Sequence, residues 1–131
     1  MDCPDCGAPT IPFDPGEYAD TLPGEEPAVA LCTRCLALHP VPEVAALPED
    51  APDFGRVSAD FPGGEAAVPF AVLVGLLDSL ALYRSEVSTL LAAVERAGTD
   101  PLLALDRLAA DPGLEPAVDL GVRRKQLEQL L

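Results

Sequence analysis

Apolar residues recur at helical steps along the second half of the chain. They stand at Leu73, Leu77, Leu80, Val87, Leu91 and Val94, with Arg84 between the third and the fourth. Because steps of three and four place side chains on one face of an α-helix, this pattern predicts a helix over about residues 66–97. Ser85 is a suitable N-cap, so a break into two helices near Tyr83–Ser85 is the alternative. Gly98 supplies a C-terminal stop.

Two shorter helices are predicted after this one. Asp100 is a suitable cap and Pro101 a suitable first residue for a helix that ends at Asp111–Gly113. The last helix is expected to begin at about Pro116 or Asp119 and to run to the final residue. The apolar residues expected to face inward are Leu102, Leu105, Leu108, Leu120, Leu127, Leu130 and Leu131.

The first forty residues carry two short stretches typical of β-strands. These are Ile11–Phe13 and Ala28–Leu31. Pro9 and Pro12 favour a position at the edge of a sheet, because proline has no N–H to donate to a neighbouring strand. Residues 14–27 lie between the two stretches and are rich in turn-forming residues.

Residues 41–65 are rich in proline, glycine and acidic side chains. A stretch of this length without secondary structure is unusual inside a compact domain, so it is predicted to be a linker. Two forms of linker remain open. One is tethered in places through Phe54, Val57 and Phe61, and the other is flexible throughout.

The charge of the chain is strongly negative. Its 131 residues include 22 acidic and 8 basic side chains, for a net charge of −14, and Lys125 is the single lysine. Acid excess with so little lysine resembles the proteins of halophiles, in which a solvated carboxylate surface maintains solubility in molar salt. The same charge disfavours nucleic acid as a partner, because phosphate contacts need lysine and arginine.

No targeting or membrane-spanning segment is expected. Residues 1–20 lack the basic start and apolar run of a secretory signal. The strongest apolar run, residues 69–77, is far shorter than the ~20 residues that a membrane span needs. The protein is therefore expected in the cytoplasm, where disulfides are disfavoured and paired cysteines indicate a metal site.

All four cysteines fall in two Cys-x-x-Cys pairs. The pairs are Cys3 with Cys6 and Cys32 with Cys35. Two such turns brought face to face offer four thiolates at tetrahedral corners, the arrangement that Zn²⁺ accepts. Gly7, directly after the first pair, suits a residue that needs a positive φ. We therefore predict one structural zinc ion, with no ligand position left for a substrate.

Other uses of the cysteines remain open. Iron in a rubredoxin-like site is one, although the chain is poor in aromatic residues. A redox-active pair is another, although Cys3 does not follow a strand as such a cysteine would. His39 is near enough to the second pair to replace one ligand, and is otherwise interpreted as a polar residue ending a strand.

The sequence "CPDCG" followed by "CTRC" resembles a zinc ribbon, in particular the CPxCG-related zinc-finger proteins common in halophilic archaea. The whole acidic chain resembles an uncharacterised haloarchaeal family that joins such a ribbon to helices. The resemblance implies that Cys3, Cys6, Cys32 and Cys35 are the zinc ligands. The second pair departs from the pattern, because Leu36 stands where glycine is expected, and the gap between the pairs is longer than usual.

The expected fold is therefore α+β and has two folded parts. Residues 1–40 form a zinc ribbon of short antiparallel strands, residues 41–65 the linker, and residues 66–131 a helical hairpin or small bundle. No enzyme is expected, because the chain has one histidine and no free cysteine for a nucleophilic site, and it has no phosphate-binding loop.

Two features concern possible partners. The basic residues Arg123, Arg124 and Lys125 could contact an anion or a partner, or could form an ordinary solvated face paired with Glu128. Residues 70–82 are apolar on nearly all sides, which indicates either a core helix or a contact with a protein partner or a second copy.

The predicted function is that of a non-enzymatic zinc protein acting as an interaction or adaptor module. A nucleic-acid-binding regulator of transcription is the first alternative, and a rubredoxin-like redox protein is the second.

Overall fold

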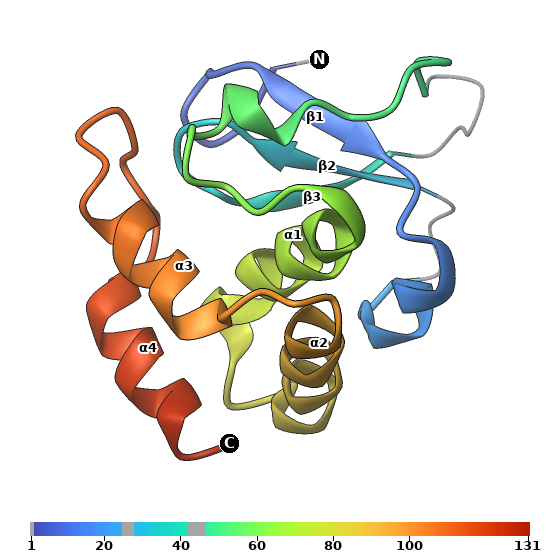
Figure 1. The fold of residues 1–131 in the computed structure, drawn as a ribbon. Coiled ribbons are helices and arrows are strands. Elements are labelled where there is room, and N and C mark those ends of the chain that lie inside the picture. Colours follow the sequence, from blue (N-terminus) through green and yellow to red (C-terminus); the bar gives the residue numbers. More distant parts are fainter. Residues whose placement is uncertain (1, 25–27, 42–46) are drawn as a thin grey trace.

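A computed structural model describes residues 2–24, 28–41 and 47–131 and confirms the α+β fold. A three-stranded sheet in the first part of the chain is followed by four α-helices (Figure 1). The strands are β1 (Thr10–Phe13), β2 (Ala28–Cys32) and β3 (Leu38–Val41). The α-helices are α1 (Ala67–Leu76), α2 (Arg84–Arg96), α3 (Pro101–Ala109) and α4 (Leu120–Glu128). Short 3₁₀ helices are η1 (Gly16–Thr21), η3 (Phe54–Arg56), η4 (Gly64–Ala66) and η5 (Leu77–Ser79).

The sheet is antiparallel, with β2 between β1 and β3. Both predicted strands are present, and Pro12 lies on an edge strand as expected. The third strand contains Pro40 and pairs with β2 through a register that sets Leu31 opposite Leu38. His39 lies inside β3 rather than at the end of a strand.

The prediction of one helix over residues 66–97 is wrong, and the alternative with a break is confirmed. Helix α1 gives way to η5 at Leu77, and α2 begins at Arg84. Ser85 does not cap α2: the N-cap is Tyr83, which makes no capping side-chain bond. The break follows from residues 78–79, Asp and Ser, which favour turns over a helix interior.

The starts of α3 and α4 agree with the sequence. Asp100 caps α3 by accepting hydrogen bonds from two backbone N–H groups, and Pro101 is the first residue of that helix. Asp119 caps α4 through the N–H of Val122. Gly98 has a φ of 90° directly after α2, in the left-handed conformation that glycine adopts freely. The predicted end of the last helix is wrong: α4 ends at Glu128 rather than at the final residue, and Leu131, expected to face inward, is 62% exposed.

One hydrophobic core joins the sheet, the proline-rich segment and the helices. Leu31 of β2, Phe54 of η3, Phe70 of α1, Leu90 of α2 and Leu105 of α3 belong to the same buried cluster. Figure 1 shows α1 lying along the sheet, with α2 beyond it and α3 and α4 to one side. The cysteine-bearing part therefore packs on the helical part. Residues 42–46 of the predicted linker lie outside the described residues.

All four phenylalanines of the chain form one continuous series of ring contacts. Phe13 of β1 meets Phe54 edge-on at 5.2 Å between ring centres, and Phe54 stacks on Phe61 at 5.1 Å. Phe61 then meets Phe70 of α1 edge-on at 5.1 Å. With Val57 also buried, the prediction that Phe54, Val57 and Phe61 tether this segment is confirmed.

Helix α1 is buried within the chain itself. Residues Phe70 to Leu73 have no exposed surface, and Leu77 of η5 has none. These side chains belong to the core, which agrees with the alternative of a core helix. The apolar face that suggested a protein partner or homodimer at residues 70–82 is therefore covered, apart from its end, where Ala81 is exposed and Leu82 is 78% exposed.

Gly75 lets α1 approach β3 closely. A Cβ atom at this position would lie 2.6 Å from the Cβ of Leu38 and 2.8 Å from its Cδ2. Carbon atoms in van der Waals contact lie about 3.5–4 Å apart, so a side chain here overlaps Leu38. Glycine at residue 75 thus sets the distance between the helix and the strand.

Replacing Gly75 by alanine is expected to destabilise the protein by about 1–3 kcal/mol, because overpacking outweighs the gain in helix propensity. Urea unfolding followed by circular dichroism measures the change. Gly63→Ala is the control, because a Cβ there meets nothing within 4 Å and its φ of −105° suits any residue. Leu38→Gly removes the Cβ atom that a residue 75 side chain would meet, so the Gly75→Ala, Leu38→Gly double variant should lose less than the sum of the two single losses. Additive losses would contradict the proposed overlap.

Among the described residues, no helix has the length and apolar character required to cross a membrane.

Candidate metal centre

The pairing of β1 with β2 brings the two cysteine pairs together. Thr10 is opposite Cys32 in the register, so the turn before β1 and the turn after β2 share one end of the sheet. Within the first turn, the N–H of Cys3 donates to the carbonyl of Ala8, and the N–H of Gly7 donates to the carbonyl of Cys3, both at 2.8 Å. In the second turn the N–H of Cys32 donates to the carbonyl of Ala37 at 2.9 Å, so backbone hydrogen bonds shape both turns.

The residue after each pair has the same left-handed backbone conformation. Gly7 has a φ of 81° and Leu36 a φ of 64°. A left-handed leucine costs roughly 1–2 kcal/mol. Burial of a leucine side chain contributes about 1.5–3 kcal/mol, and Leu36 is only 4% exposed within the main core. Leu36 in place of glycine therefore keeps the conformation of the turn, and its side chain packs in the main core.

The four sulfurs converge. Cys3 Sγ lies 3.7 Å from Cys35 Sγ, and Cys6 Sγ lies 3.4 Å from Cys32 Sγ. All four lie within 4.8 Å of one another, and none is in a disulfide. A tetrahedral ion with metal–sulfur bonds of about 2.3 Å places sulfurs about 3.8 Å apart. The cluster therefore has the size of a four-cysteine metal site. Cys6 is exposed, whereas the other three are buried.

The four thiols differ in their electrostatic surroundings. The backbone N–H of Ala8, then the Cys32 thiol, lower the pKa of Cys6 to about 7. Burial opposes ionisation of Cys3, but backbone N–H groups of the same turn lower its pKa. Burial raises the pKa of Cys32 and of Cys35. In the metal-free chain the first turn therefore supplies thiolates more readily than the second.

This difference predicts how metal binding depends on pH. Binding requires thiolates, so each proton still on a sulfur must be released. Because Cys6 has a pKa of about 7, it carries its proton below pH 7 and has lost it above. We expect about one fewer proton to be released per bound ion at about pH 8 than at about pH 6. The affinity for the metal should rise with pH over the same range.

Calorimetry in buffers of different ionisation enthalpy counts these protons. Thiolate absorbance of the metal-free chain, compared with that of Cys6→Ser, shows whether Cys6 is the group that titrates near pH 7. An equal number of protons released at both pH values by the natural chain would contradict the assignment.

The second cysteine turn is bonded to the segment that joins α3 and α4. The N–H of Glu115 donates to the carbonyl of Arg34 at 2.9 Å, and the N–H of Ala117 donates to the carbonyl of Cys35 at 3.0 Å. On its other side, Thr33 donates to the carbonyl of Pro9 through both its N–H and its hydroxyl. The candidate metal centre is therefore attached to both the first turn and the helical part.

His39 lies beside the sulfur cluster. Its Nε2 is 3.4 Å from Cys3 Sγ and 3.8 Å from Asp5 Oδ2. It is not one of the four converging sulfur ligands, but Cys3, Asp5 and His39 form a second group of potential metal ligands within 4.8 Å. His39 was a candidate ligand from its position in the sequence, whereas Asp5 was not, although it lies between the two cysteines of the first pair.

A family model matches residues 2–131, from the first cysteine turn through α4. The chain belongs to DUF6276, a family of unknown function. The DUF6276 match thus spans the cysteine cluster and the helices as one unit. The chain matches no curated protein and no solved structure.

The basic cluster of this DUF6276 chain lies on α4. The Nε of Arg124 forms an ion pair with Asp106 of α3 at 2.9 Å, and its Nη1 pairs with Glu128. Arg123 donates to Gln126 at 2.9 Å. These contacts join α3 to α4 and occupy the Arg124 guanidinium. Of the three residues, Arg123 and Lys125 are the ones left for an outside anion or partner.

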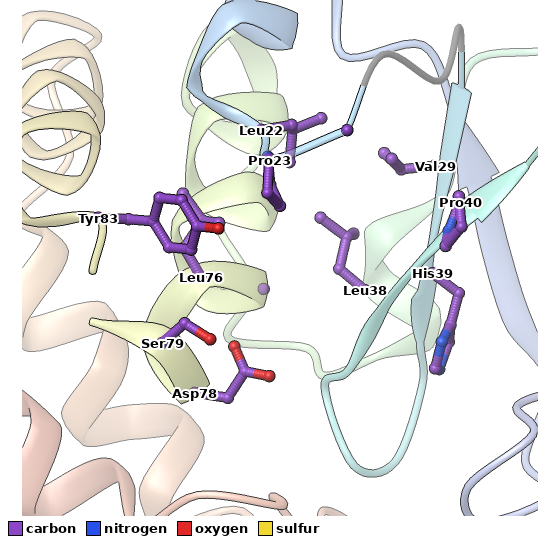
Figure 2. Close-up of a pocket in the computed structure, with 12 residues that line it drawn as sticks. Leu22, Pro23, Val29, Leu38, His39, Pro40, Leu76, Asp78, Ser79 and Tyr83 are labelled. Carbon is purple, nitrogen blue, oxygen red and sulfur yellow. The ribbon is translucent and has the colours of Figure 1, made fainter. Parts of the chain in front are cut away.

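A groove of about 390 Å³ runs between the sheet and the end of α1 (Figure 2). Leu38 of β3 and Leu76 of α1 give it apolar walls, and Asp78, Ser79 and Tyr83 add polar groups. Its lining comes from segments far apart in the sequence, which explains why no motif predicted it.

Proposed function

We propose that this DUF6276 protein binds one structural zinc ion through Cys3, Cys6, Cys32 and Cys35. The observation that carries the proposal is the convergence of four free sulfurs within 4.8 Å. Four thiolates complete the tetrahedral coordination that zinc prefers and leave no position for a reacting water. The ion would hold the two turns together at the end of the sheet.

Four thiolates in a tetrahedron accept zinc or iron, and zinc is proposed here because the surroundings of the cluster lack the aromatic side chains expected of a rubredoxin-like protein. The side chains packed with the buried cysteines are those of Ala8 and Ala37, and the four phenylalanines lie in the separate main core. Elemental analysis of the purified protein should find at least one zinc per chain and no iron, and its spectrum should show no visible absorption band. Iron with a strong visible band would support the rubredoxin-like alternative instead. Cys35→Ser should reduce the bound zinc, whereas Ser85→Ala, at an exposed position on α2, should not.

We propose further that the protein is not an enzyme and acts through contacts with another protein. The closed ligand set supports a structural ion, and the net charge of −14 favours a basic protein surface over an acidic one. Because α1 is covered, the partner surface would lie elsewhere on the molecule.

Cross-linking in the native host at its own salt concentration, followed by mass spectrometry, tests this role. A discrete partner that binds the purified, zinc-loaded chain would support it. A chain that remains monomeric and unpartnered in the cell and turns over a substrate would contradict it.

The nucleic-acid alternative has less support. Arg34 is the basic residue of the cysteine turns, and Arg124 is already paired with acidic side chains. A phosphate contact would rest on Arg34, Arg123 and Lys125 against 22 acidic residues. Gel shifts with single- and double-stranded probes compare the chain with an Arg34→Ala, Arg123→Ala double variant. Binding that the double variant loses would favour this alternative over the adaptor role.

The acidic surface predicts a dependence of stability on salt. Raising ionic strength from about 0.1 M to 1 M shortens the Debye length from about 10 Å to 3 Å and screens the repulsion among the 22 acidic side chains. We therefore expect the thermal midpoint of the zinc-loaded protein to rise with KCl concentration. A midpoint that is unchanged or falls would contradict the proposed adaptation to high salt.

A further inference from the structure

Cys3 belongs to two groups of converging ligand atoms. On one side its sulfur lies 3.7 Å from Cys35 Sγ, within the four-cysteine cluster. On the other side the same sulfur lies 3.4 Å from His39 Nε2, which is 3.8 Å from Asp5 Oδ2. Sulfur, imidazole nitrogen and carboxylate oxygen are all ligands of Zn²⁺ and of similar transition-metal ions.

The geometry of the second group fits a metal ion. Tetrahedral bonds of about 2.0–2.3 Å place a nitrogen about 3.5 Å from a sulfur and about 3.3 Å from an oxygen. The distances of 3.4 Å and 3.8 Å are close to these values. The Asp5 side chain is 68% exposed and that of His39 is 16% exposed. The carboxylate can therefore move by a few tenths of an ångström while the imidazole stays fixed.

Charge also favours a cation at this position. Four thiolates around one Zn²⁺ leave a net charge of −2, and the Asp5 carboxylate adds a further negative charge beside it. A thiolate bound to one metal retains lone pairs that can bind a second. A second divalent ion would therefore meet an anionic flank that already presents nitrogen and oxygen ligands.

We infer that Cys3, Asp5 and His39 form a second metal site, which takes a divalent transition-metal ion with Cys3 as the bridging thiolate. The inference rests on the proposed four-cysteine site. The second site differs from the first because it has three protein ligands and opens to solvent at Asp5. Water therefore completes its coordination, and its ion exchanges more readily than the enclosed one.

Titration of the metal-free, reduced protein with Co²⁺ tests the inference, because cobalt reports its ligands by absorption. We expect a first equivalent with a four-thiolate spectrum, then a weaker second equivalent. His39→Ala and Asp5→Asn should each lose the second step and keep the first. Asp20→Asn removes the same charge from another exposed position and should keep both steps.

The outcomes separate this inference from the proposed function. Saturation at one equivalent, or a second equivalent that His39→Ala and Asp5→Asn both retain, would overturn the second site and leave the first. A chain that binds no cobalt would overturn both. Loss of the second step in these two variants alone, with the four-thiolate spectrum unchanged, establishes the second site.

Discussion

Removing the proposed zinc ion is expected to lower the thermal midpoint of the whole protein, helices included. When the free zinc concentration is about a thousand times the dissociation constant, binding adds about 4 kcal/mol to the free energy of unfolding. For a chain of this size that corresponds to roughly 15 °C. The helices should lose stability together with the sheet, because Leu31 of β2 and Phe70 of α1 share one core.

Circular dichroism at a helix-sensitive wavelength, with and without a chelator, measures this effect. Cys32→Ser should reproduce the low midpoint and should not respond to the chelator, because Cys32 is buried among the other sulfurs. Leu82→Ala serves as the matched control, since this side chain is 78% exposed. Helices that melt at one temperature with or without metal would show either that no ion is bound or that the helical part folds independently.

Phe54→Ala is expected to cost about 3–5 kcal/mol, the usual loss for a buried phenylalanine. The ring is 4% exposed and contacts both Phe13 and Phe61, so its removal interrupts the series of rings that joins β1 to α1. Urea unfolding of the metal-loaded protein gives the free energy of unfolding.

Phe54→Leu keeps most of the volume and should lose much less stability, which provides a folded variant should alanine prevent folding. A loss near zero for both variants would show that residues 47–65 are held to the core by other contacts. A large loss for alanine and a small one for leucine would establish this segment as part of the folded unit.

Local signals predicted the starts of α3 and α4 accurately. Asp100 and Asp119 cap their helices because a carboxylate can accept hydrogen bonds from N–H groups two or three residues later in the chain. A short stretch of sequence is therefore enough to predict such a cap. The break between α1 and α2 was harder to place, because the apolar spacing continues through it. Burial of α1 on all sides is a property of the whole chain, so the sequence left open whether a partner covers it.

In the candidate metal centre, too, local features were predictable from the sequence and long-range contacts were not. Spacing alone identified the four cysteines, because each turn is a local structure. The left-handed Leu36 was not predictable, because the contacts that offset its conformation come from a distant part of the core. The position of His39 beside Cys3 depends on the pairing of β2 with β3, which short-range patterns do not specify.

The bond from Ala117 to Cys35 has a consequence for the newly made protein. A ribosome adds about 5–20 residues per second, so the second cysteine turn emerges on the order of ten seconds before the segment that will cover it. During that interval the sulfurs are open to metal ions and to oxidants alike. Metal uptake by the proposed site therefore does not have to wait for the helices to fold.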